Sequence, residues 1–512
     1  MRQAKLVLCE LLALLIIFAA QSVAWAQKAQ NFTIGPFEIT GFYQFYVDTP
    51  TEHHNSNNTS CLSFIIGPFQ CSPGLQQEGG KPNLLLLRQL LDLNIFGKFN
   101  ENWSATFEPR FFFDMTKIAD DHWRQYESLP APFTGNGWML RGGGNDFKAE
   151  MWQAYVDYRS GGWWVRTGKQ QIAWGEALGL RVLDTVEPLD LSQNLATDRI
   201  FEEFDRVRIP QWFLRADYTF PNETIPDLTA EFILNPGAVV PTILPPQGSP
   251  FNVVPAFLKI RNQVPQGEPT VGGRITGTVD PVQFSVNFIT KPNDDGVGVF
   301  RQLLPTTGFP ANCLFPDFPP GPACIGLNAH HPRIYIVGGS ANYNWTWAGA
   351  VLRAETTVTT NAPFQRNNTA GLPVAIVDRT VWKTVLAVDR PTYVIPGLDS
   401  MTIGFQFFET YTSGNKDGLT DATGAQVDSN LHQFTVYFQQ PLFDKRVSLE
   451  FFALLDTDDA HWLQPGVHWE VGDHVRLDLF YNQFGGAEKR GSRFGSNLNF
   501  ANGPFFRFTY GF

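Results

Sequence analysis

Apolar and polar side chains alternate along many short stretches of this chain, and a two-residue period limits what it can fold into. In WSATFEPRFFFD (103–114), Trp103, Phe107 and Phe111 fall on one face, whereas Glu108 and Arg110 fall on the other. The same alternation recurs at 38–47, 212–220, 282–290, 432–439, 447–456 and 475–482. This is the period of a β-strand, and repeated alternating runs of about ten residues are typical of transmembrane β-barrels.

The connections between these stretches alternate between short and long. Short turns are predicted at Asn100–Asn102, Ser160–Gly162, Asp280–Pro281, Asn342–Asn344, Phe443–Lys445 and Gly472–Asp473. Long loops are predicted near 49–83, 115–146, 174–209, 236–269, 292–332, 360–375 and 484–503. Short turns at one end and long loops at the other are typical of outer-membrane barrels. We therefore expect an all-β, antiparallel, up-and-down transmembrane barrel of about 18 strands, with 16 as the alternative.

Both ends of the chain carry export signals. Two basic residues precede an apolar run at 11–20, and Ala24-Trp25-Ala26 follows, which predicts a cleaved signal peptide over 1–26 and a barrel over 27–512. A membrane anchor is the alternative, but the apolar run is shorter than the roughly 20 residues of a spanning helix. The last strand, GPFFRFTYGF, ends on Phe512 and resembles the signal by which bacterial barrels reach their insertion machinery. These features predict Sec export and a Gram-negative outer-membrane location, among outer-membrane lipid and lipopolysaccharide.

Composition narrows the function classes. Aromatic residues make up 14% of the chain, as in barrels with aromatic girdles, and the net charge of −11 argues against nucleic-acid binding. Local cysteine pairs in Pro/Gly-rich segments predict two disulfides, with free thiols as the alternative. These pairs are Cys61/Cys71 and Cys313/Cys324.

Charged residues on the polar faces are expected to line the lumen, because unpaired charges facing lipid are costly. Neither sign dominates, so no ion selectivity is predicted. The charges form either a polar path for solutes or a salt-bridged wall that stiffens the barrel, and the wall is the favoured interpretation. The residues are Arg88, Asp92, Glu108, Arg110, Asp114, Arg215, Asp217, Glu231, Arg353 and Glu355, with Arg476 and Asp478 as a further pair.

No motif for catalysis, metal binding or a cofactor stands out. The chain contains no GxSxG, no HExxH and no P-loop, and RGGGND (141–146) precedes a strand rather than joining a strand to a helix. We therefore predict no enzyme activity, no metal and no cofactor. A barrel enzyme acting on lipids stays an alternative, because such enzymes need no sequence-local motif.

The long loop 174–209 is unusually apolar for a loop. Leucines and valines follow Trp174, and Ile200, Phe201, Phe204 and Val207 recur at helical spacing, with Asp198 as an N-cap and Pro210 as a stop. The lumen is the nearest place to bury them. The loop is therefore predicted to fold inward as a constriction containing short helices.

The residues around this loop resemble a Gram-negative outer-membrane barrel family of unknown function. The pattern is Gly-Arg/Lys-Gln-Gln, then Trp-Gly-Glu/Lys, an Asp, Pro-x-Asp, and Arg-x-Pro before the next strand. Lys169 replaces the commoner Arg, and Glu187 stands where many members have Asn. The matching residues are Gly168, Lys169, Gln170, Gln171, Trp174, Gly175, Glu176, Asp184, Pro188, Asp190, Arg208 and Pro210.

The resemblance implies a porin-like channel for small hydrophobic or amphipathic molecules. It also implies partners, because relatives often accompany a periplasmic lipid carrier and an inner-membrane transporter of the resistance-nodulation-division type. Trp174 and Glu176 are expected near the narrowest point. A diffusive porin for small polar solutes is the first alternative, and adhesion through external loops is a weaker one.

Overall fold

A computed structural model describes most of the chain. The described residues are 32–51, 84–119, 140–143, 147–193, 198–202, 206–222, 224–244, 258–265, 267–304, 324–368, 373–394, 398–414, 417–421, 426–457, 460–486, 498 and 501–512. The predicted signal peptide therefore lies outside them. None of the helices in these ranges has the length and hydropathy to span a membrane.

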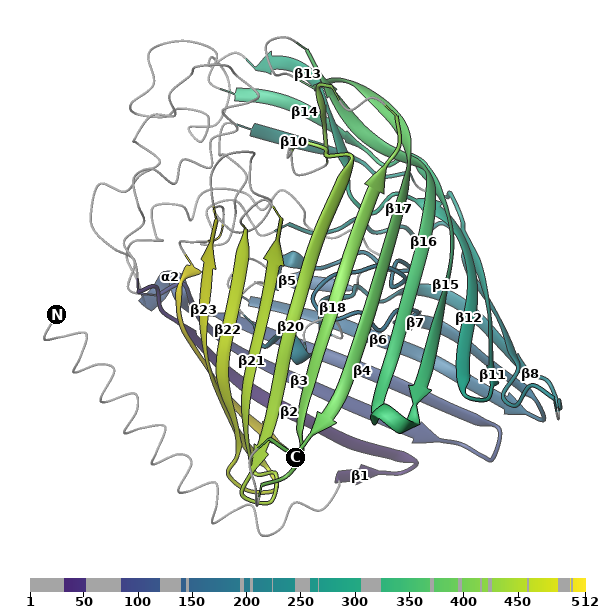
Figure 1. The fold of residues 1–512 in the computed structure, drawn as a ribbon, viewed down its shortest axis with the longest axis vertical. Helices are drawn as coiled ribbons and strands as arrows, with labels where there is room; N and C mark the ends of the chain where they lie inside the picture. Colours follow the sequence, from purple (N-terminus) through teal and green to yellow (C-terminus); the bar gives the residue numbers. More distant parts are fainter. Residues whose placement is uncertain are drawn as a thin grey trace, which may run out of the picture.

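Eighteen long strands form one closed antiparallel barrel within the described residues (Figure 1). They pair with their neighbours in chain order, and the barrel closes where the last strand pairs with the first, for example Phe508 with Phe45. The 18-stranded, up-and-down expectation is confirmed. The strands are β2 Phe37–Asp48, β3 Leu86–Lys98, β4 Trp103–Asp114, β6 Phe147–Ser160, β7 Trp163–Gln170, β8 Gln211–Thr219, β9 Thr229–Asn235, β11 Thr270–Val279, β12 Val282–Pro292, β15 Arg333–Trp345, β16 Ala350–Asn367, β17 Pro373–Thr392, β18 Met401–Thr412, β20 Asn430–Leu442, β21 Val447–Asp456, β22 His461–Glu470, β23 Val475–Gly485 and β24 Gly503–Gly511.

Short elements extend the edges of this barrel. β1 (Phe32–Ile34) pairs with the start of β2, β5 (Arg141–Gly143) with β6, and β19 (Leu419–Thr420) with β16. A four-residue helix, α2 (Thr116–Ala119), follows β4.

The outer face carries the large apolar side chains that the alternation predicted. These side chains remain exposed although they are aromatic or aliphatic, which is the arrangement a lipid-facing surface requires. Exposed examples are Phe111, Phe113, Leu214, Phe232, Ile275, Val286, Phe288, Val337, Trp382, Leu386, Phe405, Leu455 and Leu479. The terminal Phe512 is also partly exposed, and its backbone bonds to Gly41 of β2.

Five of the six predicted short turns lie where strands meet at one end of the barrel. The sixth, Asn342–Asn344, was placed wrongly, because these residues belong to β15. Alternation continues through Trp345, and the turn is the 3-10 segment η9 (Thr346–Ala348), closed by Gly349 at φ 59°. The predicted loop at 360–375 was also wrong. β16 and β17 extend through most of it, and Asn361 at φ 57° accommodates a bulge in their pairing.

The long loops contain a small sheet that sequence reasoning missed. β10 (Leu258–Gln263) pairs in parallel with β14 (Cys324–His330), which pairs antiparallel with β13 (Val297–Leu304). Figure 1 places this sheet at the loop end of the barrel, near the ends of β16 and β17.

Candidate functional site

The loop between β7 and β8, residues 171–210, is called the inner loop, and its described residues, 171–193, 198–202 and 206–210, lie inside the barrel. Its described residues bond to strands around the whole circumference, so it crosses the lumen. The inward fold of the loop is confirmed, but two 3-10 turns, η5 (Leu191–Gln193) and η7 (Ile200–Glu202), stand in its described residues where short helices were expected. The wall partners are Gln44 on β2, Glu231 on β9, Lys291 on β12, Asn342 on β15, Glu355 on β16, Gln406 on β18, Glu450 on β21, Gln464 on β22 and Arg507 on β24.

The Trp174-Gly175-Glu176 motif anchors the first part of the inner loop. The Trp174 indole N–H donates to Glu231 at 2.9 Å, and the Glu176 backbone N–H donates to the Glu355 carboxylate. A Cβ on Gly175 would lie 2.6 Å from the Asp184 backbone nitrogen, so only glycine permits this close approach. Each of the three motif residues therefore serves a separate contact.

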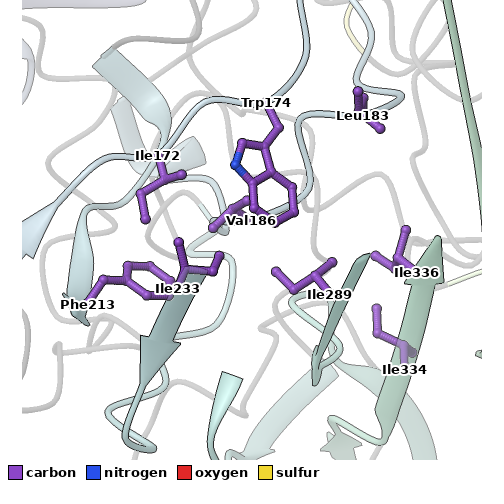
Figure 2. Close-up of a cluster of buried hydrophobic side chains, with 9 residues drawn as sticks. All are labelled: Ile172, Trp174, Leu183, Val186, Phe213, Ile233, Ile289, Ile334 and Ile336. Carbon is purple, nitrogen blue, oxygen red and sulfur yellow. The ribbon is translucent and has the colours of Figure 1, made fainter. Parts of the chain in front are cut away.

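Apolar side chains of the inner loop pack against the inner face of the wall. Trp174 is 3% exposed and lies among isoleucines of β9, β12 and β15 (Figure 2). Because the inner face turns apolar where the loop lies against it, loop and wall share a hydrophobic core. The cluster contains Ile172, Trp174, Leu183, Val186, Phe213, Ile233, Ile289, Ile334 and Ile336.

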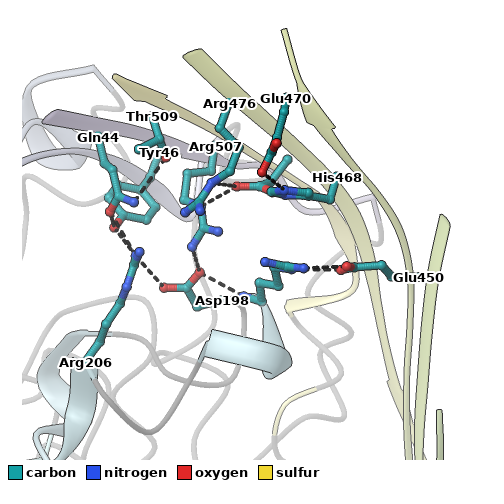
Figure 3. A network of polar contacts seen from close by, with 12 residues as sticks. Gln44, Tyr46, Asp198, Arg206, Glu450, His468, Glu470, Arg476, Arg507 and Thr509 are labelled. Atoms are coloured by element: carbon teal, nitrogen blue, oxygen red, sulfur yellow. Dashed lines mark hydrogen bonds and ion pairs between the residues drawn. The ribbon is translucent and has the colours of Figure 1, made fainter. Parts of the chain in front are cut away.

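A second anchor holds the loop on the opposite wall (Figure 3). Arg199 forms a two-pronged ion pair with Glu450, in which Nε lies 2.8 Å from Oε2. The Asp198 carboxylate accepts from Arg507 of β24 at 2.9 Å, and Arg206 donates to Gln44 of β2. Asp198 is thus tied to the barrel wall, whereas the sequence had placed it as an N-cap.

The two arms of the inner loop meet next to the start of β8. Arg208 pairs with Asp184 at 3.3 Å, and the Ile209 backbone N–H donates to the Pro188 carbonyl. Asp190 donates its backbone N–H to Val207, and its carboxylate pairs with Arg141 of β5. Pro210 is buried directly before β8 begins. The structure therefore brings the second half of the sequence motif together in one place.

Glu187 is the most unusual ionisable group of the loop. It is fully buried, and one carboxylate oxygen accepts from the Ile172 backbone N–H. Among the described residues its other oxygen has no hydrogen-bond partner. Burial, followed by the nearby charge of Asp184, raises the pKa of Glu187 well above its ordinary value. For Asp190 burial also acts upward, but Arg141 and Lys148 outweigh it and lower the pKa.

Comparison with known families places the chain. A family described as "Protein of unknown function (DUF1302)" matches residues 87–503. The chain belongs to this family. No curated protein matches it.

Solved outer-membrane proteins resemble this DUF1302 member only distantly. A triple mutant of the Rhodopseudomonas blastica porin is 10% identical, with 93% of this chain and 100% of that chain covered and a TM-score of 0.35. Salmonella typhi OmpF in complex with daunomycin is 9% identical, with 93% and 97% covered and a TM-score of 0.38. A loop-deleted OmpT of Vibrio cholerae is 6% identical, with 93% and 99% covered and a TM-score of 0.37. Likenesses this distant assign no function.

The first part of the sequence motif closes strand β7. Gly168 has φ 132°, and any Cβ there would collide with the Ala154 carbonyl oxygen. The Lys169 ammonium lies 5.8 Å from the ring centre of Trp152, and the side-chain amide of Gln170 donates to the Phe213 carbonyl. Gln171 donates to the Arg208 carbonyl at 2.6 Å. These side chains join the strand end to β6, to β8 and to the second arm of the inner loop.

The charged residues named from the sequence form several separate groups on the inner face. Arg88 pairs with Asp114, Arg110 with both Asp92 and Glu108, and Arg215 with both Asp217 and Glu231. Arg476 lies 3.7 Å from Asp478.

Arg353 and Glu355, which the sequence also placed on the inner face, have separate partners. Arg353 pairs with Asp389 rather than with Glu355, and Glu355 instead accepts backbone N–H groups of the inner loop.

Sequence reasoning missed the wall residues that form hydrogen bonds and ion pairs with the loop. Gln406, Glu450 and Gln464 each occupy an inward position between outward apolar residues, and this is the signal that marks them. Of the four cysteines, Cys61, Cys71 and Cys313 lie outside the described residues, as does the side chain of Cys324. The two disulfides stay predictions.

Proposed function

We propose that this chain is an outer-membrane channel whose lumen is narrowed by the inner loop. It would pass small hydrophobic or amphipathic molecules. The observation that carries the proposal is the apolar interface between loop and wall, because a path for ions and sugars gains nothing from buried isoleucines. The proposal assigns no catalytic residue and no cofactor.

The two halves of the inner face differ, which supports an amphipathic cargo. Apolar inward residues of the wall, such as Ile233, Ile289 and Phe452, are buried where the loop packs on them. Two residues nearer the turns on the same strands, the inward residues are polar or charged, and two of them, Glu231 and Glu450, also bond to the loop, whereas Asn287 has an amide nitrogen without a partner among the described residues. A cargo with an apolar body and a polar head can contact both surfaces at once.

The test removes the loop and measures ion conductance. Residues 176–207 are replaced by a short flexible linker, and the full chain and the variant are compared in planar bilayers. We expect low conductance from the full chain and a large, ohmic increase in the variant. Equal conductance would contradict a narrowing role. High conductance of the full chain would favour the diffusive porin for polar solutes.

The partners remain part of the proposal. A periplasmic carrier and an inner-membrane transporter would supply or remove a cargo that is poorly soluble in water. Co-purification of the tagged full chain with such proteins, compared with an unrelated barrel of similar abundance, would test this.

A further inference from the structure

The recess that Trp174 fills is shaped by a missing side chain on the wall. Gly272 on β11 faces the lumen beside Ile233 and Ile289. A Cβ on Gly272 would lie 3.0 Å from each of three atoms, namely Cη2 of Trp174, Cγ1 of Ile233 and the Phe288 carbonyl oxygen, so glycine leaves room for the indole ring against this part of the wall. The wall therefore leaves a small apolar recess at Gly272, and Trp174 of the inner loop occupies it, among the isoleucines that Figure 2 shows.

The recess has a polar rim with an acceptor and two unused donors. Glu231 accepts the indole N–H of Trp174. Directly across from Glu231 on β11 lies Arg274, and directly across from Arg274 on β12 lies Asn287. Among the described residues, neither Arg274 Nε nor Asn287 Nδ2 has a hydrogen-bond partner, and Asn287 is 4% exposed. Buried donors without acceptors are costly, so the rim favours a group that accepts hydrogen bonds.

The surrounding charge decides what kind of acceptor fits. The carboxylate that faces the indole is Glu231, and Arg215, which pairs with Glu231, also pairs with Asp217. Two carboxylates against one guanidinium group make the acceptor side of the rim negative. A ligand carboxylate would meet repulsion there, whereas a neutral hydroxyl can donate to Glu231 and accept from Arg274 or Asn287.

We propose that the Trp174 recess is the cargo-binding site of this channel, and that Trp174 occupies it as a built-in competitor. The ligand class is a neutral, flat, fused-ring molecule with one hydroxyl group. The cargo enters by displacing the indole, which frees the first anchor of the inner loop. This proposal rests on the proposed channel function, because it names the class of molecule that the channel passes.

Binding to the detergent-solubilised full chain tests the site without requiring conduction. 2-Naphthol serves as the probe because it has two fused rings, like indole, and one hydroxyl. The Trp174→Ala variant should bind 2-naphthol about tenfold more tightly than the unmodified chain, since the competitor is gone. Trp382→Ala is the matched control, because Trp382 is an exposed residue on the outer face of β17 and lies outside the recess. It should leave the affinity unchanged.

Two further comparisons test the shape and the polarity. Adding Gly272→Val to Trp174→Ala should fill the recess and abolish the gain, with heat-modifiable migration on gels confirming that the barrel folds. In Trp174→Ala, 2-naphthol should bind about tenfold more tightly than naphthalene, which lacks the hydroxyl, and more tightly than 2-naphthoate, which adds a negative charge.

The outcomes separate this inference from the channel proposal. Equal or tighter binding of 2-naphthoate, or no gain in Trp174→Ala, would overturn the assigned ligand class and site. If 2-naphthol binds as expected but loop removal leaves conductance unchanged, the recess stands as a binding site and the channel proposal fails.

Discussion

Replacing Arg199 by methionine should release the second anchor of the inner loop from the barrel wall. Arg199 and Glu450 are an ion pair whose side chains are 10% and 2% exposed, so solvent screens their attraction little. Methionine keeps the apolar stem of arginine but leaves the Glu450 charge buried without its partner. Breaking a buried pair in this way costs about 3–5 kcal/mol. At about 1.4 kcal/mol per factor of ten, the released population should rise roughly 10²- to 4 × 10³-fold.

The assay measures how often the loop leaves the wall. Ile200 is 1% exposed and its backbone N–H donates to Gln464, so its side chain is accessible only when this part of the loop is released. Ile200→Cys, in a chain whose native cysteines are replaced by serine, is reacted with a water-soluble maleimide. When release and return are fast, the labelling rate follows the released population, and Arg199→Met should accelerate it by the same factor.

Two variants guard the interpretation. The double variant Arg199→Met with Glu450→Gln removes both charges, so most of the acceleration of labelling should disappear. The side chain of residue 450 on β21 can still accept the hydrogen bond that Gln439 donates to it. Arg333→Met removes a guanidinium from an exposed pair with Glu268 and should change nothing. If the double variant labels as fast as Arg199→Met alone, the ion pair is not what holds the loop.

Three other changes have defined outcomes. Because burial raises the pKa of Glu187 in the docked loop, docking should strengthen as pH falls through that raised pKa, by up to about tenfold per pH unit, and stop changing below the ordinary carboxyl pKa. Since the maleimide reacts with the thiolate, the labelling rate of Ile200→Cys is divided at each pH by that of an exposed reference, Ser160→Cys, and Glu187→Gln should flatten the pH dependence of this ratio. Gly175→Ala forces a Cβ against the Asp184 backbone and should weaken docking by about 1–3 kcal/mol, seen as higher conductance, whereas Gly161→Ala in an open turn should not change conductance. The two predicted disulfides should appear as crosslinked peptides in mass maps of the unreduced chain, and separate peptides would refute them.

The strands and the outer face were predictable because they depend on local order. A two-residue period decides which side chains share a face, whatever strand lies next to it. Phe506, Phe508 and Tyr510 were thus placed on one face before any pairing was known. The turn predicted at Asn342–Asn344 was wrong because the strand was ended too early. Asparagines favour turns, but they also occur inside strands that face a polar lumen.

The candidate site was predictable in part. The apolar residues of the inner loop, together with the need to bury them, indicated the lumen. Their partners were not predictable, because Arg199 and Glu450 are 251 residues apart and periodicity carries no information about contacts over such separations. The apolar inner face beside the loop was missed for the same reason: which wall residues meet a loop depends on its path across the lumen.

By itself, the order of residues determined an antiparallel barrel, its outward face and a loop that must be buried. Closure of the barrel decided the rest. Only when β24 pairs with β2 do Arg507 and Gln44 come to lie beside Asp198 and Arg206. Likewise, only the pairing of β9, β11 and β12 sets Glu231, Arg274 and Asn287 in one row below Trp174. Strand pairing joins residues that are far apart in the sequence, and it determines which wall residues surround the inner loop.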